Sequence, residues 1–269
     1  KPMPELNLDI LDATIDVVRR VAQSEVMPRF LKVAYARKHD GTVVTEADIA
    51  SQAALARELR QVVDVPLLGE EMSDAEQEAE WQQGMAGMWC VDPIDGTTNF
   101  VHGVPHFAVS VAFMRNGRPE MGVIYNPAMD EMYYALKGHG AFLNGERLPL
   151  KNFAPPMHNA VAGIELKYLP GKLPSRLMAV APYSSQRNIG SSTLDWCWLA
   201  AGRFDLILHG GQRLWDYAAG CLILEEAGGK LGSIHHRDFW EDQLWHRSAV
   251  AALNPELFEQ WYAWVQANK

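Results

Sequence analysis

The segment that most constrains this chain is residues 92–99, with the sequence DPIDGTTN. It follows the apolar stretch 88–91, which is typical of a buried strand. Pro93 disfavours a helix at the residue before it, so Asp92 and Asp95 are expected at a strand end. Gly96 and the threonines after it favour a turn whose backbone amides can face an anion. Two hard oxygen ligands beside such a turn suit a divalent cation and a phosphate group, although a simple strand-ending turn uses the same residue types.

Composition limits the classes of protein that this chain can be. With 269 residues and 48% apolar side chains, it can bury a large core. Its net charge of −9 argues against a nucleic-acid surface and against binding to an anionic membrane, whereas clustered carboxylates are compatible with metal ions. We therefore expect a small-molecule substrate, with neither nucleic acid nor membrane as a partner.

Cysteine usage and the first residues bear on the compartment. Cys90, Cys197 and Cys221 are an odd number without zinc-like spacing, and they are expected to be buried thiols in a reducing environment. Residues 1–7 lack the pattern of a signal peptide. We therefore expect a cytoplasmic protein.

Apolar periodicity and turn residues predict mixed helices and strands in the first half. The expected helices are 8–31 and one that begins near Thr45. The expected strands are 65–68, 107–114, 121–126 and 131–136, with an exposed loop or short helix over 72–86. The composition shifts at 151–158, which contains Pro155-Pro156, and the predicted domains are therefore 1–152 and 153–269.

The second half alternates helices with strands. The expected strands are 160–166, 185–189, 204–209 and 247–252. The expected helices are one near 175–180, then 192–201, 216–227 and a last helix that begins at Asn254-Pro255. The fold class is therefore α/β, or α+β, in layers.

A second segment far downstream gives the first one a context. Residues 215–220 read WDYAAG and residues 225–229 read EEAGG. Together with DPIDGTTNF at 92–100, these segments resemble the two signatures of the inositol monophosphatase family. The resemblance implies a five-layered αβαβα sandwich of the inositol monophosphatase and fructose-1,6-bisphosphatase type, with the active site between the halves. It also implies a homodimer.

The resemblance implies a site for two or three Mg²⁺ ions. Its expected ligands are Glu70, Asp92, the Ile94 carbonyl, Asp95 and Asp216. From the residues alone, Glu70 could equally belong to a solvated loop, and Asp216 could be a helix N-cap. Both descriptions of Asp216 hold if its two oxygens serve different partners.

The expected catalytic residues are Asp48, Thr97 and Glu70. By resemblance, Asp48 and Thr97 position the water that attacks phosphorus. Thr45 and Asp48 also have the spacing of a capping box, which is the structural alternative.

The expected substrate contacts lie on both signatures and between them. They are Asp95, Gly96, Thr97, Thr98, Gly190, Ser192, His209 and Asp216. An ordinary serine N-cap is the alternative for the segment at 190–192. Several family members carry a carboxylate at the place of His209, and an imidazole can donate where a carboxylate only accepts, so alcohol recognition must differ. A histidine that points into solvent at a strand end is the alternative.

Two other segments receive no chemical role. Glu225 and Glu226 are expected on a solvated or packing face, and the glycines after them at a helix C-terminus. His235, His236 and the tryptophan-rich segment 239–246 could form a metal site or an aromatic cage, but a surface loop beside a packed strand is favoured.

The sequence thus predicts a Mg²⁺-dependent phosphomonoesterase that hydrolyses a small phosphorylated alcohol, such as inositol monophosphate, by attack of a metal-activated water. Alternatives within enzymes are phosphatases for histidinol phosphate, a sugar bisphosphate or a 3′-phosphoadenosine nucleotide. A regulatory or binding protein that keeps the fold is the alternative outside enzymes.

Overall fold

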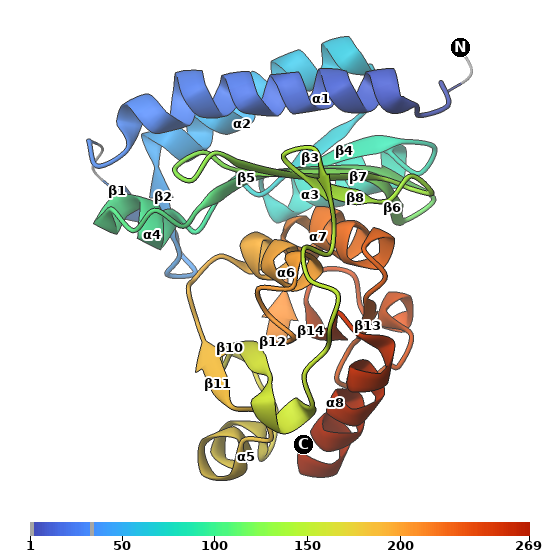
Figure 1. The fold of residues 1–269 in the computed structure, drawn as a ribbon. Coiled ribbons are helices and arrows are strands. Elements are labelled where there is room, and N and C mark those ends of the chain that lie inside the picture. The colour runs from blue at the N-terminus through green and yellow to red at the C-terminus, as the bar shows by residue number, and fades with distance from the viewer. Residues whose placement is uncertain (1–2, 33–34) are drawn as a thin grey trace.

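The computed structural model describes residues 3–32 and 35–269. Five layers follow one another through the molecule, as Figure 1 shows. Two long helices cover one face of a seven-stranded sheet, two further helices separate that sheet from a five-stranded sheet, and two helices cover the outer face of the second sheet. The layered α/β architecture expected from the sequence is confirmed.

The first sheet is mostly an antiparallel meander. Its order is β3-β4-β5-β6-β7-β8-β9, in which only the β3–β4 pair is parallel. The strands are β3 (Leu67–Gly69), β4 (Met88–Asp95), β5 (Ala108–Arg115), β6 (Arg118–Asn126), β7 (Glu131–Leu136), β8 (Ala141–Leu143) and β9 (Glu146–Arg147). All eight residues of β4 are buried, as the apolar run before the aspartates predicts.

The second sheet has the order β11-β10-β12-β14-β13. Its strands are β10 (Val161–Glu165), β11 (Ser185–Arg187), β12 (Leu206–Gln212), β13 (Lys230–Gly232) and β14 (Arg247–Ala252). The division into domains 1–152 and 153–269 stays a prediction.

The outer helices are α1 (Leu8–Val21) and α2 (Glu46–Val62) on the first sheet, and α5 (Leu173–Val180) and α8 (Pro255–Asn268) on the second. The long helix expected within 8–31 is α1, which ends at Val21. After Val21 the chain forms a π-helical turn over 22–26 and a 3₁₀ turn at 27–29, where Pro28 removes a backbone donor. Residues 72–86, expected to be exposed, contain α3 (Asp74–Gln83).

The strands β1 (Tyr35–Arg37) and β2 (Val43–Thr45) pair with each other. They, α4 (Thr97–His102), β9 and β13 escaped the sequence patterns. Each is too short to show a period. Among the described residues, none of the helices is long and apolar enough to cross a membrane.

The central layer depends on small residues in α7 (Leu214–Glu226), which packs between the first sheet and α6 (Ser192–Ala201). A Cβ on Gly122 of β6 would lie 2.9 Å from the Ala219 carbonyl oxygen of α7, and Gly220 faces the Trp196 side chain of α6 in the same way. The AAG of the second signature therefore allows two close approaches of α7 to its neighbours.

The tryptophan-rich segment 239–246 surrounds a buried cation of this chain. The Arg247 guanidinium lies 4.8 Å from the ring centres of Tyr217 and Phe239 and 5.1 Å from that of Trp240. It donates to the carbonyl oxygens of Asp242 and Gln243, and Arg247 is only 3% exposed. The segment is therefore an internal aromatic cage that fixes a loop to α7.

We predict that Arg247→Lys lowers the free energy of unfolding by about 1–3 kcal/mol, because a lysine cannot stack a planar fork between the rings while it donates to two carbonyls. Urea unfolding measures the change. Arg237→Lys is the matched control, since Arg237 also stacks on a ring and pairs with Glu259, but on an exposed surface. Its effect should stay below about 1 kcal/mol. Equal losses for the two variants would contradict the role given to burial.

Candidate active site

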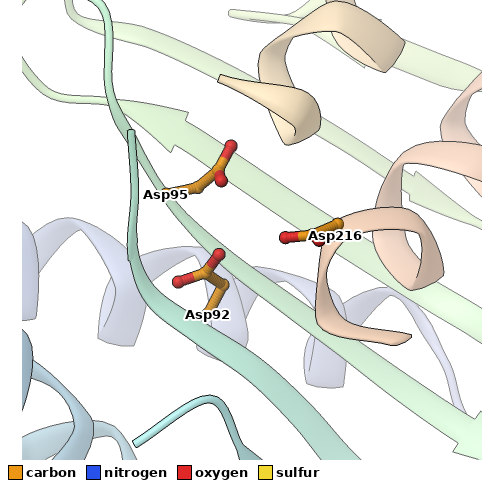
Figure 2. A group of neighbouring side chains, drawn as sticks. All are labelled: Asp92, Asp95 and Asp216. Atoms are coloured by element: carbon orange, nitrogen blue, oxygen red, sulfur yellow. The ribbon is translucent and has the colours of Figure 1, made fainter. Parts of the chain in front are cut away.

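Three carboxylates from two distant segments meet at the centre of the molecule. Asp92 and Asp95 lie at the end of β4, and Asp216 lies in the first turn of α7 (Figure 2). One oxygen from each side chain lies within 4.8 Å of the others. In a regular strand residues 92 and 95 would face opposite sides, but the β4–β5 register shifts between them and re-aims one side chain.

Glu70 reaches this group from the neighbouring strand. It follows β3, and its backbone N–H donates to the Val91 carbonyl oxygen over 3.3 Å, which sets Glu70 beside Asp92. Its carboxyl group lies beside that of Asp92, where the two groups act on each other electrostatically. Glu70 is not one of the three residues whose oxygens lie within 4.8 Å of one another.

No cationic side chain of the described residues neutralises the three aspartates. Within residues 3–32 and 35–269, no ion pair involves the three aspartates, and Asp92 Oδ1 is buried without a hydrogen-bond partner. Burial, and then the charges of Glu70 and Asp95, raise the pKa of Asp92 well above its ordinary value. Burial and the same kind of repulsion raise the pKa of Asp216, and burial raises the pKa of Glu70 to about 7. A bound cation would relieve each of these penalties.

Asp95 divides its two oxygens between two tasks. Its Oδ2 accepts hydrogen bonds from Ser191 Oγ at 2.6 Å, from the Thr193 backbone N–H at 2.8 Å and from Thr193 Oγ1 at 2.8 Å. Ser191 is the N-cap residue of α6, but its side chain makes no bond to that helix, and Asp95 accepts from the Thr193 backbone N–H in its place. The alternative of an ordinary serine N-cap at 190–192 is therefore right in position and wrong in its side-chain bond. Ser192 is partly buried, and its side chain forms no hydrogen bond with any residue that the structure describes.

Asp48 likewise serves a helix cap and the site together. Its Oδ2 accepts from the backbone N–H and hydroxyl of Thr45, which completes the capping box of α2. Its Oδ1 accepts from Thr97 Oγ1 at 2.8 Å, and Thr97 Oγ1 also lies 3.2 Å from the Ile94 carbonyl oxygen. The structural alternative and the predicted pairing of Asp48 with Thr97 thus occur in one side chain. Asp48 is fully buried, and burial raises its pKa.

The backbone at the start of α4 lies against the second half of the chain. Gly96 adopts φ +85° and Gly190 φ +94°, and a Cβ on Gly96 would lie 3.3 Å from the Gly190 carbonyl oxygen. Asn99 Nδ2 donates to the carbonyl oxygens of His106 and Ile189, both at 2.8 Å. Thr97 and Thr98 open α4, where backbone N–H groups have no partner within the helix.

His209 is buried rather than solvent-facing. It is 3% exposed on β12, and its Nε2 lies 2.8 Å from Asp195 Oδ2 of α6. The alternative of a strand-end histidine in solvent is therefore wrong. Asp216 is not the N-cap either: α7 begins two residues before the predicted start, Arg213 is the N-cap, and Asp216 Oδ2 accepts from the Arg213 backbone N–H at 2.8 Å.

Sequence reasoning missed several residues that hold the site together. These are Asn99, Ser191, Thr193, Asp195, and the ion pair of Lys38 with Glu71, whose charged atoms lie 2.7 Å apart. Asn99 stands inside the first signature and Ser191 inside the segment 190–192, so these two offered a local signal. The predicted residues and these additions come together around one acidic centre, while the role of each stays a prediction.

Comparison with known proteins agrees with this geometry. A family model described as the inositol monophosphatase family matches residues 6–268. The chain belongs to this family. It is 44% identical to the inositol-1-monophosphatase of Mesorhizobium japonicum, over 61% of this chain and 62% of that relative. It is 37% identical to the Nus factor SuhB of Pseudomonas aeruginosa, over 69% of this chain and 70% of that relative.

The fold agrees as well. The Thermotoga maritima IMPase superposes with a TM-score of 0.79 at 30% identity, over 96% of this chain and 98% of that one. The expected sandwich of the inositol monophosphatase type is therefore confirmed, and the chain is a phosphoric monoester hydrolase of this superfamily.

We predict that the metal-free protein becomes less stable as the pH rises. A carboxyl group with a raised folded-state pKa keeps its proton longer when folded, so stability falls between the ordinary value and the raised one, which for Glu70 means from 4.5 to about 7. Urea unfolding in EDTA at about pH 5 and about pH 8 measures this loss, and Mg²⁺ should restore stability at the higher pH. Asp92→Asn should weaken both effects. Metal-free stability that does not change over this pH range would refute the interpretation.

Proposed function

We propose that this protein is a Mg²⁺-dependent phosphomonoesterase that hydrolyses a small phosphorylated alcohol, with inositol monophosphate as the first candidate. Histidinol phosphate, a sugar bisphosphate and a 3′-phosphoadenosine nucleotide are the alternatives. The observation that carries the proposal is the group of three aspartates, with a buried, unpartnered oxygen on Asp92 and no ion pair to these carboxylates among the described residues.

The donor set fits a hard divalent cation. Carboxylate and carbonyl oxygens are the ligands that Mg²⁺ prefers, and Asp92, Asp95 and Asp216 would hold it together with Glu70 and the Ile94 carbonyl. When bound, Mg²⁺ neutralises the phosphate and lowers the pKa of a coordinated water. Magnesium dependence is also implied by the family.

Asp48 and Thr97 supply the proton path for the attacking water. Because both donors of Thr45 occupy Asp48 Oδ2, only Oδ1 faces Thr97. The Thr97 hydroxyl donates its proton to this oxygen, so the lone pairs of Thr97 Oγ1 can accept a hydrogen bond from water. A carboxylate whose pKa is raised by burial is a better base near neutral pH, so Asp48 can receive the proton through Thr97.

The phosphate and the alcohol are held by different parts of the chain. Gly96, Thr97 and Thr98 present the free backbone N–H groups at the start of α4 to the phosphate oxygens. On the alcohol side, Asp195 fixes one ring nitrogen of His209 and leaves Nδ1 for a substrate hydroxyl. With His209 in this position, we expect a substrate preference that differs from that of relatives with a carboxylate at the same place.

We predict that hydrolysis of small phosphate monoesters stops in EDTA and returns with Mg²⁺. Phosphate release measures it, over a panel of inositol monophosphate, histidinol phosphate, fructose 1,6-bisphosphate and 3′-phosphoadenosine 5′-phosphate. The ranking within the panel identifies the substrate class. Full activity after verified metal removal, or no activity on any panel member with Mg²⁺, would contradict the proposal.

We predict that Asp95→Asn keeps the fold and lowers kcat by about a hundredfold or more. The amide oxygen of the asparagine can accept the bonds from Ser191 and Thr193, which turns its NH₂ group, a non-ligand, toward Asp92. Circular dichroism and kcat with Mg²⁺ measure the two effects. Thr193→Val is the control, because it removes only the hydroxyl bond to Asp95 Oδ2 and leaves the carboxylate in place. Its effect on kcat should be much smaller. A folded Asp95→Asn with normal kcat would remove Asp95 from the metal site.

A regulatory role is the second candidate, and the relative named as a Nus factor favours it. The two functions differ in what they need from the acidic centre. Asp95→Asn should abolish hydrolysis, whereas a binding role that does not use the metal would survive it in a pull-down with transcription proteins. Loss of both activities in a folded Asp95→Asn protein would show that they share the site.

A further inference from the structure

Arg213 lies at the edge of the acidic centre, and its guanidinium forms no ion pair within the described part of the chain. It is the N-cap of α7, and its backbone N–H donates to Asp216 Oδ2. Its guanidinium lies 4.9 Å from the ring centre of Trp215, and Nε is buried without a hydrogen-bond partner. In the described part of the chain, the guanidinium takes part in no hydrogen bond or ion pair with a side chain, although it lies near enough to act electrostatically on Asp216.

His246 lies next to Arg213 across the sheet. The antiparallel pairing of Gln212 with Arg247 makes residues 213 and 246 neighbours where β12 and β14 diverge. The imidazole packs against Gly211, where a Cβ would collide with the ring, and against Tyr168 in an edge arrangement with 5.0 Å between ring centres. Among the described residues its nitrogens have no hydrogen-bond partner, so packing fixes the ring and leaves its polar atoms available.

Other cations near the site are already engaged. Lys38 pairs with Glu71, and Arg247 donates to two carbonyl oxygens inside its aromatic cage. The histidine on the neighbouring strand, His209, is engaged as well, because its Nε2 is within hydrogen-bond distance of Asp195 Oδ2. Arg213 directly follows β12 and lies three residues before Asp216, and His246 is its neighbour across the strand pair.

We propose that Arg213 and His246 bind a second anionic group of the substrate, a phosphate or a carboxylate carried on the alcohol portion. This inference rests on the proposed phosphatase function and narrows its substrate class to doubly anionic esters. A guanidinium with free donors can hold such a group by two parallel hydrogen bonds, and stacking on Trp215 already limits its freedom. Unpartnered donors that are partly buried are costly in the free protein, and an anion would satisfy them.

The test compares kcat/KM for two substrates that differ in one charged group, fructose 1,6-bisphosphate and fructose 1-phosphate, with Mg²⁺. The wild-type protein should favour the bisphosphate, and Arg213→Gln should lower the ratio of the two kcat/KM values by about tenfold or more, mainly through KM for the bisphosphate. His246→Asn should lower it in the same direction. Arg213→Lys, which keeps the charge, should retain part of the preference, and the preference should shrink at high salt.

Arg60→Gln is the matched control, because it removes the same charge from an exposed position on α2 and should leave the ratio unchanged. Thermal unfolding of each variant shows whether it folds; if Arg213→Gln does not, Arg213→Lys and His246→Asn decide. Equal losses for both substrates, or a wild-type protein without preference, would overturn the inference while the phosphatase function stands. No hydrolysis of any phosphate ester would instead overturn the proposed function.

Discussion

The arrangement of the acidic group depends on the carboxylate of Asp95, because it directly links the turn that carries the predicted metal ligands to the second half of the chain. One of its oxygens accepts three hydrogen bonds at the N-terminus of α6, which leaves the other for the group formed with Asp92 and Asp216. Hydroxyl and amide donors hold the side chain without neutralising it. The geometry of the acidic group is thus fixed without a bound cation.

Asp48 also has two roles, because it completes the capping box of α2 and accepts a hydrogen bond from Thr97. In both cases a helix terminus holds one oxygen of a carboxylate and orients the other. Each carboxylate is held in place because moving its second oxygen would also uncap a helix. The buried negative charges that result are costly to the empty protein, and this cost is one part of its affinity for a cation.

Local patterns were sufficient for much of the fold but not for the contacts that build the site. The helix at 192–201 and the strand at 247–252 have the predicted bounds, because each carries its own apolar pattern and end signals. The capping of α6 by Asp95 and the enclosure of Arg247 by aromatic rings join residues far apart in sequence, and no local rule reports them. The two signatures indicated the acidic group because a resemblance carries three-dimensional information that periodicity lacks.

The close approach of Gly96 to Gly190 joins the two halves of the chain beside the acidic group. These glycines lie back to back, and Asn99 fastens the two segments by donating to carbonyl oxygens on both sides. The acidic group draws Asp92 and Asp95 from the first half of the chain and Asp216 from the second, so neither half contains all of it. The predicted site is therefore a property of the contact between the two halves.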